Sequence, residues 1–511
     1  MADSPEMTEA RAWRTLVAGV GLITLFRLLT LFASPLELYP DEAQYWLWSR
    51  TLAFGYVSKP PLVAWLIAAT TVMGRDAEPF VRLSSPLIHA ATALVLARAG
   101  RRLYDPWTGA IAGGLYCLAP GAALSAFIVS TDPALLLGLA LALWAYVVLQ
   151  SAEGRAKLGP AVGFGAALGL AFLAKYAALY ALVGLAAHLI LSRDARRAWT
   201  PAAGVAAAAA FAVLAAPNLI WNAGHGFATV AHTASNADWS GRRFDVVPAL
   251  SFLGAQFGVF GPIPFAVLVG GAGWLAWRRR LAAADVLLLC FTLPPLVIIL
   301  VEAFVARANA NWAAAAYAPG AVLVAAWLAR WKAWRWLGAA GISQAVIVAA
   351  LMIGLAWPAL ADKAGLANGL KRLRGWRETT RAITERAALE DLNGGLSAVA
   401  VDDRFLFNEA AYYGRGSFGA GGPPLKMWVR GARPRSQAEL AAPLTAADGR
   451  RVLAVSLEGR STAAMAADFA RAGDRQINQV SLDLNHWRSV TSFLGDGYAP
   501  KPRAPVSATR P

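Results

Sequence analysis

Residues 246–277 read VVPALSFLGAQFGVFGPIPFAVLVGGAGWLAW, a stretch without one charged side chain. The segment 198–237 likewise contains no Asp, Glu, Lys or Arg. Both segments exceed the ~20 apolar residues that an α-helix needs to cross the hydrocarbon core of a bilayer. They therefore predict membrane-spanning helices.

The rest of the chain has the same character. Of its 511 residues, 57% are hydrophobic and 15% are charged, with a mean hydropathy of +0.47, whereas a soluble protein has about 25% charged residues. The net charge of +16 comes largely from Lys and Arg in short clusters between apolar segments. That arrangement is typical of membrane orientation and not of nucleic-acid binding. We therefore predict a mainly α-helical, polytopic membrane protein that binds no nucleic acid.

Long apolar runs predict about eleven transmembrane helices, which start near residues 12, 80, 106, 133, 159, 176, 201, 248, 282, 313 and 337. The basic clusters between these helices alternate, and the more basic side is cytoplasmic by the positive-inside rule. The N-terminus is then cytoplasmic. Because the number of spans is odd, the C-terminal part is expected on the periplasmic side.

After Pro358 the composition becomes polar, and no further run is long enough to span a membrane. Two strands and two helices are predicted there by period and composition, at residues 396–401, 451–457, 370–389 and 462–472. We expect three parts: a membrane domain, a small α/β domain and a disordered Pro-rich tail, in residues 1–358, 359–498 and 499–511.

The loop of residues 34–79 contains PDEAQYWLW at residues 40–48, in which Asp41 and Glu42 follow a proline and precede aromatic side chains. Proline and acidic residues are typical of the first turn of a helix, where the helix dipole favours negative charge. A carboxylate fixed at that position is also a positioned base. Helix capping and catalysis are therefore both open for this pair.

The same loop continues with GYVSKPPLVAWL at residues 55–66. The two prolines fix the backbone and predict the start of a helix at residues 62–74, which is too short to span and is therefore interfacial. Lys59, directly before the prolines, is expected at the membrane surface. It would contact a phosphate headgroup there or simply snorkel to the lipid surface.

Three further charged residues lie within or beside apolar runs. Asp132 precedes Pro133 and is consistent with an ordinary helix start. Lys175 would cost about 2.5 to 3.5 kcal/mol if it faced lipid, so it needs a lipid phosphate or a carboxylate such as Asp41 or Asp132 as partner. Arg27 in the first span raises the same problem, unless it snorkels to the external end of its helix.

Taken in order, these segments resemble the bacterial family 39/83 glycosyltransferases of the GT-C class, which include protein O-mannosyltransferases and the lipid A aminoarabinose transferase. The resemblance covers residues ~20 to 320 and includes three more segments: STDP at 130–133, LAKY at 173–176, and PNLIWN at 217–222 followed by His225-Gly226. It implies a GT-C membrane fold. It also implies sugar transfer from a polyprenyl phosphate to an envelope acceptor at the periplasmic face of the inner membrane. Lipid A or lipopolysaccharide, protein and cell-wall glycan all remain open as acceptor.

The resemblance implies that Asp41 is the catalytic carboxylate, that Glu42 supports it and that Lys59 contacts the donor. Lys175 and Tyr56 are further candidates for the donor phosphate. The expected substrate-binding residues are Asp132, Tyr45, Trp221, Asn222, His225, Arg307 and Asn311. Relatives often carry an acidic residue where this chain has Ser58, so a divalent metal cofactor is undetermined; Asp41 and Glu42 are its candidate ligands.

A polyprenyl phosphate is already a good leaving group, so direct displacement needs only a base for the acceptor and cations for the departing phosphate. Such a hexosyl- or pentosyltransferase inverts the anomeric carbon. The alternative is a secondary transporter or a lipid-linked sugar flippase, in which Arg27, Asp132 and Lys175 would be pathway charges. No inverted repeat is visible, and the predicted carboxylates collect on one face, which favours the enzyme.

Overall fold

The computed structural model describes residues 5–236, 244–306, 308–431 and 434–501. Most of the tail predicted to be disordered, residues 502–511, lies outside them. The chain divides into two compact units. The membrane unit comprises Met1–Ala33 and Lys59–Ile353, and the α/β unit comprises Ser34–Ser58 and Gly354–Pro511.

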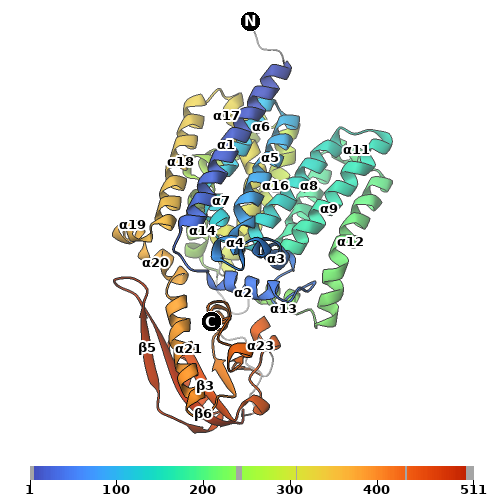
Figure 1. The fold of residues 1–511 in the computed structure, drawn as a ribbon. Coiled ribbons are helices and arrows are strands. Elements are labelled where there is room, and N and C mark those ends of the chain that lie inside the picture. The colour runs from blue at the N-terminus through green and yellow to red at the C-terminus, as the bar shows by residue number, and fades with distance from the viewer. Residues whose placement is uncertain (1–4, 237–243, 307, 432–433, 502–511) are drawn as a thin grey trace. The chain divides into compact units, whose positions relative to one another are not determined.

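The membrane unit is built from long apolar helices (Figure 1). Among the described residues, eight helical segments are long and apolar enough to cross a bilayer. They are α1 (Pro5–Ala33), α4 with α5 (Glu78–Arg82 and Ser84–Leu103), α8 (Thr131–Gln150), η1 with α9 (Gly154–Lys157 and Leu158–Ala174), α12 (Pro201–Gly224), α16 (Ala283–Val305), η3 with α17 (Ala310–Ala316 and Tyr317–Arg330) and α18 (Trp334–Ala356).

Two further spans are broken. The pair α6 (Pro106–Cys117) and α7 (Pro120–Phe127) bends by 56°, and the pair α14 (Val246–Phe260) and α15 (Pro262–Trp277) bends by 118°. In each pair the second helix begins at a proline, which cannot continue the hydrogen-bond ladder of the first.

The eleventh predicted run forms a 3-10 turn and a shorter apolar helix, η2 (Tyr176–Leu179) and α10 (Tyr180–Leu191). Every predicted run is therefore helical. By length and composition, however, at most ten described segments count as spans, one fewer than expected.

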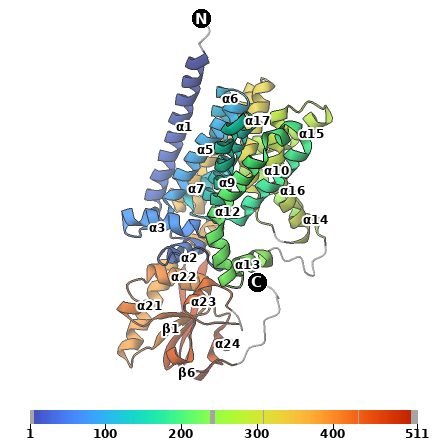
Figure 2. The ribbon, with the colours of Figure 1, turned by 90° about the vertical axis from the view of Figure 1, so that its right-hand side faces the viewer.

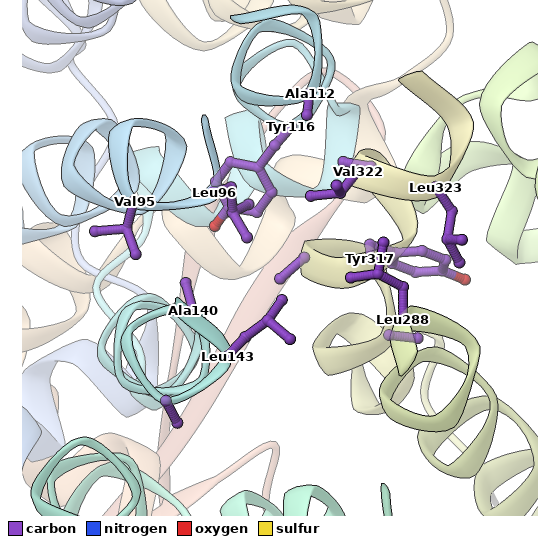
Figure 3. Close-up of a cluster of buried hydrophobic side chains, with 14 of the residues drawn as sticks. Val95, Leu96, Ala112, Tyr116, Ala140, Leu143, Leu288, Tyr317, Val322 and Leu323 are labelled. Atoms are coloured by element: carbon purple, nitrogen blue, oxygen red, sulfur yellow. The ribbon is translucent and has the colours of Figure 1, made fainter. Parts of the chain in front are cut away.

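The core of the membrane unit lies where α5, α6, α8, α16 and α17 meet. Figure 3 shows Leu96, Tyr116, Leu143, Leu288 and Val322 from these five helices pointing toward one another. Small residues let neighbouring helices approach closely. A Cβ added to Gly165 of α9 would lie 2.0 Å from the carbonyl oxygen of Ala207 in α12.

The shorter helices connect these elements. In the membrane unit they are α3 (Leu62–Gly74), α11 (Arg193–Ala198) and α13 (Ala228–Asn236). In the α/β unit they are α2 (Pro40–Ser49), α19 (Pro358–Lys363), α20 (Ala367–Leu370), η4 (Lys371–Leu373), η5 (Gly419–Gly421), α23 (Gln437–Ala441), η6 (Ala446–Asp448) and α24 (Thr462–Ala466).

The α/β unit is a six-stranded mixed sheet with α21 (Trp376–Leu392) and α22 (Arg404–Tyr413) packed on it (Figure 2). Its strand order is β2-β1-β3-β6-β4, and β5 also pairs with β6. The strands are β1 (Ala398–Val401), β2 (Leu425–Met427), β3 (Arg451–Leu457), β4 (Phe469–Ala472), β5 (Gln476–Ser481) and β6 (Trp487–Tyr498). The β2-β1-β3 part is parallel, and β6 is antiparallel to β3, β4 and β5.

The sequence predictions for this unit are largely confirmed. The two predicted strands are β1 and β3, and the helix predicted at residues 370–389 is α21, which begins six residues later. The helix predicted at residues 462–472 is wrong in its second half, where β4 begins at Phe469. The rings of Phe493 and Tyr498 on β6 lie 5.9 and 5.2 Å from the ring of Phe469. Sheet pairing and aromatic packing thus override the local helical pattern.

Candidate functional site

The acidic pair of the first loop opens α2, as its proline predicts. Tyr39 is the N-cap, and the fully buried Glu42 carboxylate accepts a hydrogen bond from the Tyr39 N–H at 2.8 Å. Asp41, in the same first turn, is partly exposed. Within the described residues its carboxylate makes no hydrogen bond and no ion pair. The two neighbours therefore differ: Glu42 caps the helix, and Asp41 is open to a ligand.

The loop that carries Asp41 is fixed inside the α/β unit. The Trp46 ring of α2 meets Tyr412 of α22 edge-on at 4.8 Å. Glu37 accepts hydrogen bonds from the N–H groups of Trp376 and Arg377, at 2.5 and 3.2 Å, and so caps α21. Burial raises the pKa of Glu37, and these two donors counteract the rise. Residues 34–58 thus join the C-terminal domain through contacts between residues far apart in sequence.

Tyr45 and Tyr56 belong to an aromatic group within the same segment. Tyr45 lies 5.3 Å from Trp48, which stacks on Tyr56 at 4.5 Å. The single O–H of Tyr56 is shared between the carbonyls of Trp48 and Thr51, at 3.0 and 3.2 Å, and the hydroxyl oxygen accepts from the Ala53 N–H. Tyr56 therefore closes the turn after α2, and its predicted contact with the donor phosphate stays a prediction.

In the membrane unit, three predicted residues from separate segments meet. Asp132 lies in the first turn of α8, Lys175 directly follows α9, and Asn311 lies in η3. The Lys175 ammonium donates to Asp132 Oδ1 at 2.7 Å, and the Asn311 amide donates to Asp132 Oδ2 at 2.8 Å. The charge of Lys59 also acts on the Asp132 carboxylate. The anionic partner that Lys175 requires is thus Asp132.

These residues share one end of the helix bundle. Asp132 stands where α8 begins, Lys175 where α9 ends, and Asn311 in η3, which follows the end of α16. The predicted helix start after Pro60 and Pro61 is confirmed, since α3 begins at Leu62. The motifs of the membrane unit therefore lie at the same level, as the alternation of spans predicts.

The PNLIWN segment forms the last turns of α12. Asn222 is fully buried. Its amide donates to the Tyr176 hydroxyl and the Asn218 carbonyl, both at 3.0 Å, and its oxygen accepts from the Thr229 N–H. The exposed His225 stacks on Trp221 with ring centroids 4.0 Å apart. Asn222 thus supports the residue beside Lys175, whereas Trp221 and His225 present their rings at the surface of the unit.

Arg27 does not snorkel to the external end of α1, one of the possibilities that its position in the sequence leaves open. Only 2% of the residue is exposed, and its guanidinium donates to the Cys117 carbonyl at 2.5 Å. Cys117 ends α6, where the helix dipole is negative. Arg27 therefore bonds to the C-terminus of α6, a role that only the folded arrangement reveals.

Two predictions stay open. Arg307 lies outside the described residues. In the described ranges, no three His, Cys, Asp or Glu side chains gather to hold a metal ion, and the carboxylate of Glu42 is engaged in the helix cap.

Known proteins resemble this chain along most of its length. Residues 58–221 match the protein family described as Dolichyl-phosphate-mannose-protein mannosyltransferase. The chain is 38% identical over 401 residues to the lipid A galacturonosyltransferase RgtD of Rhizobium johnstonii. The aligned region covers 76% of this chain and 80% of that protein. The residue identity extends well beyond the short motifs of the first loop.

Solved structures confirm the fold. The crystal structure of ArnT from Cupriavidus metallidurans in the apo state matches with a TM-score of 0.67 at 16% identity, over 94% of this chain and 98% of ArnT. The structure of the same protein bound to undecaprenyl phosphate matches with a TM-score of 0.64 at 18% identity. This match covers 93% of this chain and 97% of ArnT. The enzyme interpretation is thereby confirmed over the transporter alternative. With its helical spans and small C-terminal sheet unit, the chain belongs to the GT-C membrane glycosyltransferases of bacterial family 39/83.

Proposed function

We propose that this glycosyltransferase moves one sugar from a polyprenyl phosphate to lipid A, with Asp41 as the base. The observation that carries the proposal is the Asp41 carboxylate, which the fold fixes at the start of α2 and leaves open to a ligand. Lipid A is proposed because RgtD, 38% identical, is a lipid A galacturonosyltransferase. The same relative makes galacturonate the first sugar to test.

In the proposed step, an acceptor hydroxyl oxygen attacks the anomeric carbon of the donor. The bond from that carbon to the phosphate oxygen breaks, and the phosphate leaves with the electron pair. Asp41 takes the hydroxyl proton as the new bond forms. One displacement inverts the anomeric carbon.

The departing phosphate needs positive charge at the moment of bond breaking. We assign this role to Lys59 and Lys175. Asp132 holds the Lys175 ammonium at 2.7 Å and uses only one of its three N–H donors. The carboxylate therefore positions the cation, and two donors remain for a phosphate.

We further propose that the site faces the periplasm at the inner membrane, with a cytoplasmic N-terminus and a periplasmic α/β unit. This orientation requires an odd number of spans, so η2 with α10 must cross the membrane in addition to the ten segments counted above. Basic residues collect at the end of the bundle opposite Asp132: Arg98, Arg101, Arg102, Arg278, Arg279, Arg280, Arg330, Lys332 and Arg335. The positive-inside rule supports a cytoplasmic position for that end. Reporter fusions after Arg280 and Arg335 should be cytoplasmic, and a C-terminal fusion periplasmic. A cytoplasmic C-terminus would refute this orientation.

The transfer itself is tested with purified protein, polyprenyl phosphate galacturonate labelled in the sugar, and lipid A. The expected products are labelled lipid A and free polyprenyl phosphate. An intact donor would refute the function. Label on protein or cell-wall glycan, when these are offered in place of lipid A, would move the proposal to that acceptor. Mass spectrometry of envelope glycolipids from cells lacking the protein should show lipid A without this sugar.

A further inference from the structure

Four arginines of the α/β unit lie over aromatic rings next to α2, and we call them the arginine platform: Arg50 over Trp46, Arg372 over Tyr39, Arg377 over Tyr413 and Arg415 over Tyr412. The distances from guanidinium carbon to ring centroid are 5.4, 5.9, 5.0 and 4.8 Å. Cation–π contacts of this kind hold a guanidinium in a defined plane.

Three of the four rings beneath these arginines contact one another. Trp46 of α2 meets Tyr412 of α22 at 4.8 Å, and Tyr412 meets Tyr413 at 4.8 Å. The Tyr413 hydroxyl accepts the N–H of Leu38, directly before Tyr39. The platform therefore spans α2 and α22, two helices that pack on each other (Figure 2).

Arg372 and Arg415 are the members of the platform whose charge is not compensated by a carboxylate in the described part of the chain. Both side chains are exposed, and within the described residues neither has a carboxylate at ion-pair distance. Arg372 donates to the Tyr39 hydroxyl and Arg415 to the Tyr412 carbonyl, each at 2.7 Å. The exposed Arg381 of the same unit differs, because it pairs with Glu385 at 2.7 Å.

The remaining platform members contribute less. The negative charge of Glu37 partly compensates the positive charge of Arg377. Arg50 donates to the Ser49 hydroxyl. The ligand-binding capacity of the platform therefore rests on Arg372 and Arg415. Each guanidinium has five N–H donors in a fixed fork that matches phosphate and carboxylate oxygens. A ring and one hydrogen bond already orient it, so little freedom is lost when an anion binds.

We propose that Arg372 and Arg415 bind anionic groups, phosphate or carboxylate, on the saccharide headgroup of the acceptor. This inference rests on the proposed function, because an acceptor hydroxyl must come to Asp41 for transfer. Arg372 lies over the ring of Tyr39. Tyr39 is the N-cap of α2, and Asp41 is the second residue of that helix. An acidic glycolipid held at the platform is therefore held beside the base. The two arginines make acceptor recognition charge-dependent.

A purely structural role makes a different prediction. The Tyr412 carbonyl lies in the last turn of α22, where a cation is favourable in any case. If Arg415 and Arg372 only fasten their tyrosines, their substitution lowers thermal stability and leaves the acceptor KM unchanged. The acceptor KM and the melting temperature must therefore be measured on the same variants.

The experiment compares Arg372→Gln, Arg415→Gln, the double variant and Arg372→Lys with the wild type in nanodiscs of neutral lipid. Arg381→Gln is the matched control, an exposed arginine already paired with a carboxylate. The acceptor is a phosphorylated lipid A, and the same glycolipid without phosphates serves as the neutral acceptor. Single variants should raise the KM for the anionic acceptor roughly 3- to 10-fold, and the double variant more. The donor KM and the neutral-acceptor KM should not change, and Arg372→Lys should retain part of the effect.

Three outcomes would overturn the inference while the wild type still transfers sugar. In the first, the KM for the anionic acceptor is unchanged in the double variant. In the second, the KM of the double variant rises equally for the anionic and the neutral acceptor. In the third, the KM rises only in nanodiscs that contain anionic phospholipid. The last outcome would assign the arginines to the membrane surface. No transfer by the wild type with any acceptor would instead refute the proposed function. Binding of the anionic acceptor by the Asp41→Asn protein, with and without the two Gln substitutions, tests the platform independently of turnover.

Discussion

The two aspartates on which the proposed chemistry depends have opposite surroundings. Asp132, in the membrane unit, is buried and has a partner on each oxygen, Lys175 and Asn311. Asp41, in the α/β unit, is partly exposed and has neither a hydrogen bond nor an ion pair in the described part of the chain. A buried carboxylate needs compensation, whereas one that meets water does not. The contrast supports the proposal that Asp132 positions a cation and that Asp41 transfers the proton.

The largest effect is expected at Asp41. Asp41→Asn should lower transfer more than ~100-fold, because the amide keeps the shape of the side chain but cannot accept the acceptor proton. The melting temperature should stay that of the wild type, since no bond is lost within the protein. Steady-state transfer assays check this, with the exposed Asp194→Asn as control. A folded Asp41→Asn protein with most of its activity would move the base to Glu42 or Asp132.

The next largest effect concerns Lys175 and its ion pair. Lys175→Met should lower donor use ~10- to 150-fold, through a lost charge-assisted contact with phosphate. It should also cost ~3 to 5 kcal/mol of stability, because Asp132 then lacks its counter-ion. The double variant Lys175→Met/Asp132→Asn should regain stability but not donor use. If it regains both, the lysine serves only the carboxylate.

Lys59→Met tests whether the two lysines meet one phosphate. Alone it should also lower donor use ~10- to 150-fold and leave acceptor affinity nearly unchanged. Combined with Lys175→Met, the loss should be smaller than the product of the two single losses, because contacts to one group are not independent. The measurement varies donor and acceptor separately, with the partly exposed Lys157→Met as control. Unchanged donor kinetics in both single variants would contradict the phosphate assignment.

The starts of α2 and α3 could be predicted from the sequence because they depend on local chemistry: prolines, acidic first-turn residues and an apolar run. The strands β1 and β3 were predictable for the same reason, since they are short, apolar and buried. The bond from Asn311 to Asp132 was not, because the two residues are 179 positions apart. Nor was β6, whose polar sequence becomes a central strand only by pairing with β3, β4 and β5.

The same limit explains the site. Residue types identified Asp41, Lys59, Asp132 and Lys175 as candidates, but their partners follow from tertiary contacts. The sequence placed residues 34–58 with the membrane spans, whereas in the structure they pack with α21 and α22. That grouping follows from contacts of Trp46 and Glu37 with residues more than 300 positions away, for which a single sequence carries no signal.

Asn311→Ala should have a moderate effect, because Asp132 keeps its ion pair and loses only the amide donor. We expect donor use to fall roughly 3- to 10-fold and stability by ~1.5 to 3 kcal/mol, the range for a hydrogen bond to a charged group. Asn309→Ala is the matched control, two residues earlier and exposed, without a side-chain cap bond. An Asn311→Ala protein as stable and active as the control would show that Lys175 alone holds Asp132.

The smallest effect on transfer is expected at Asn222, although the sequence analysis counted it among the substrate-binding residues. Its amide is committed to the Tyr176 hydroxyl, the Asn218 carbonyl and the Thr229 N–H, and the residue is fully buried. Asn222→Ala leaves those groups without their partner, so stability should fall by ~1 to 3 kcal/mol. Both KM values should stay within ~3-fold of the wild type below the melting temperature, because both the N–H donors and the oxygen of the buried Asn222 amide are already engaged within the protein. His225→Ala provides the contrast, since it removes an exposed ring that stacks on Trp221 and bonds only to its carbonyl. A donor or acceptor KM raised ~10-fold or more in a fully folded Asn222→Ala protein would mean that Asn222 exchanges its partners for substrate.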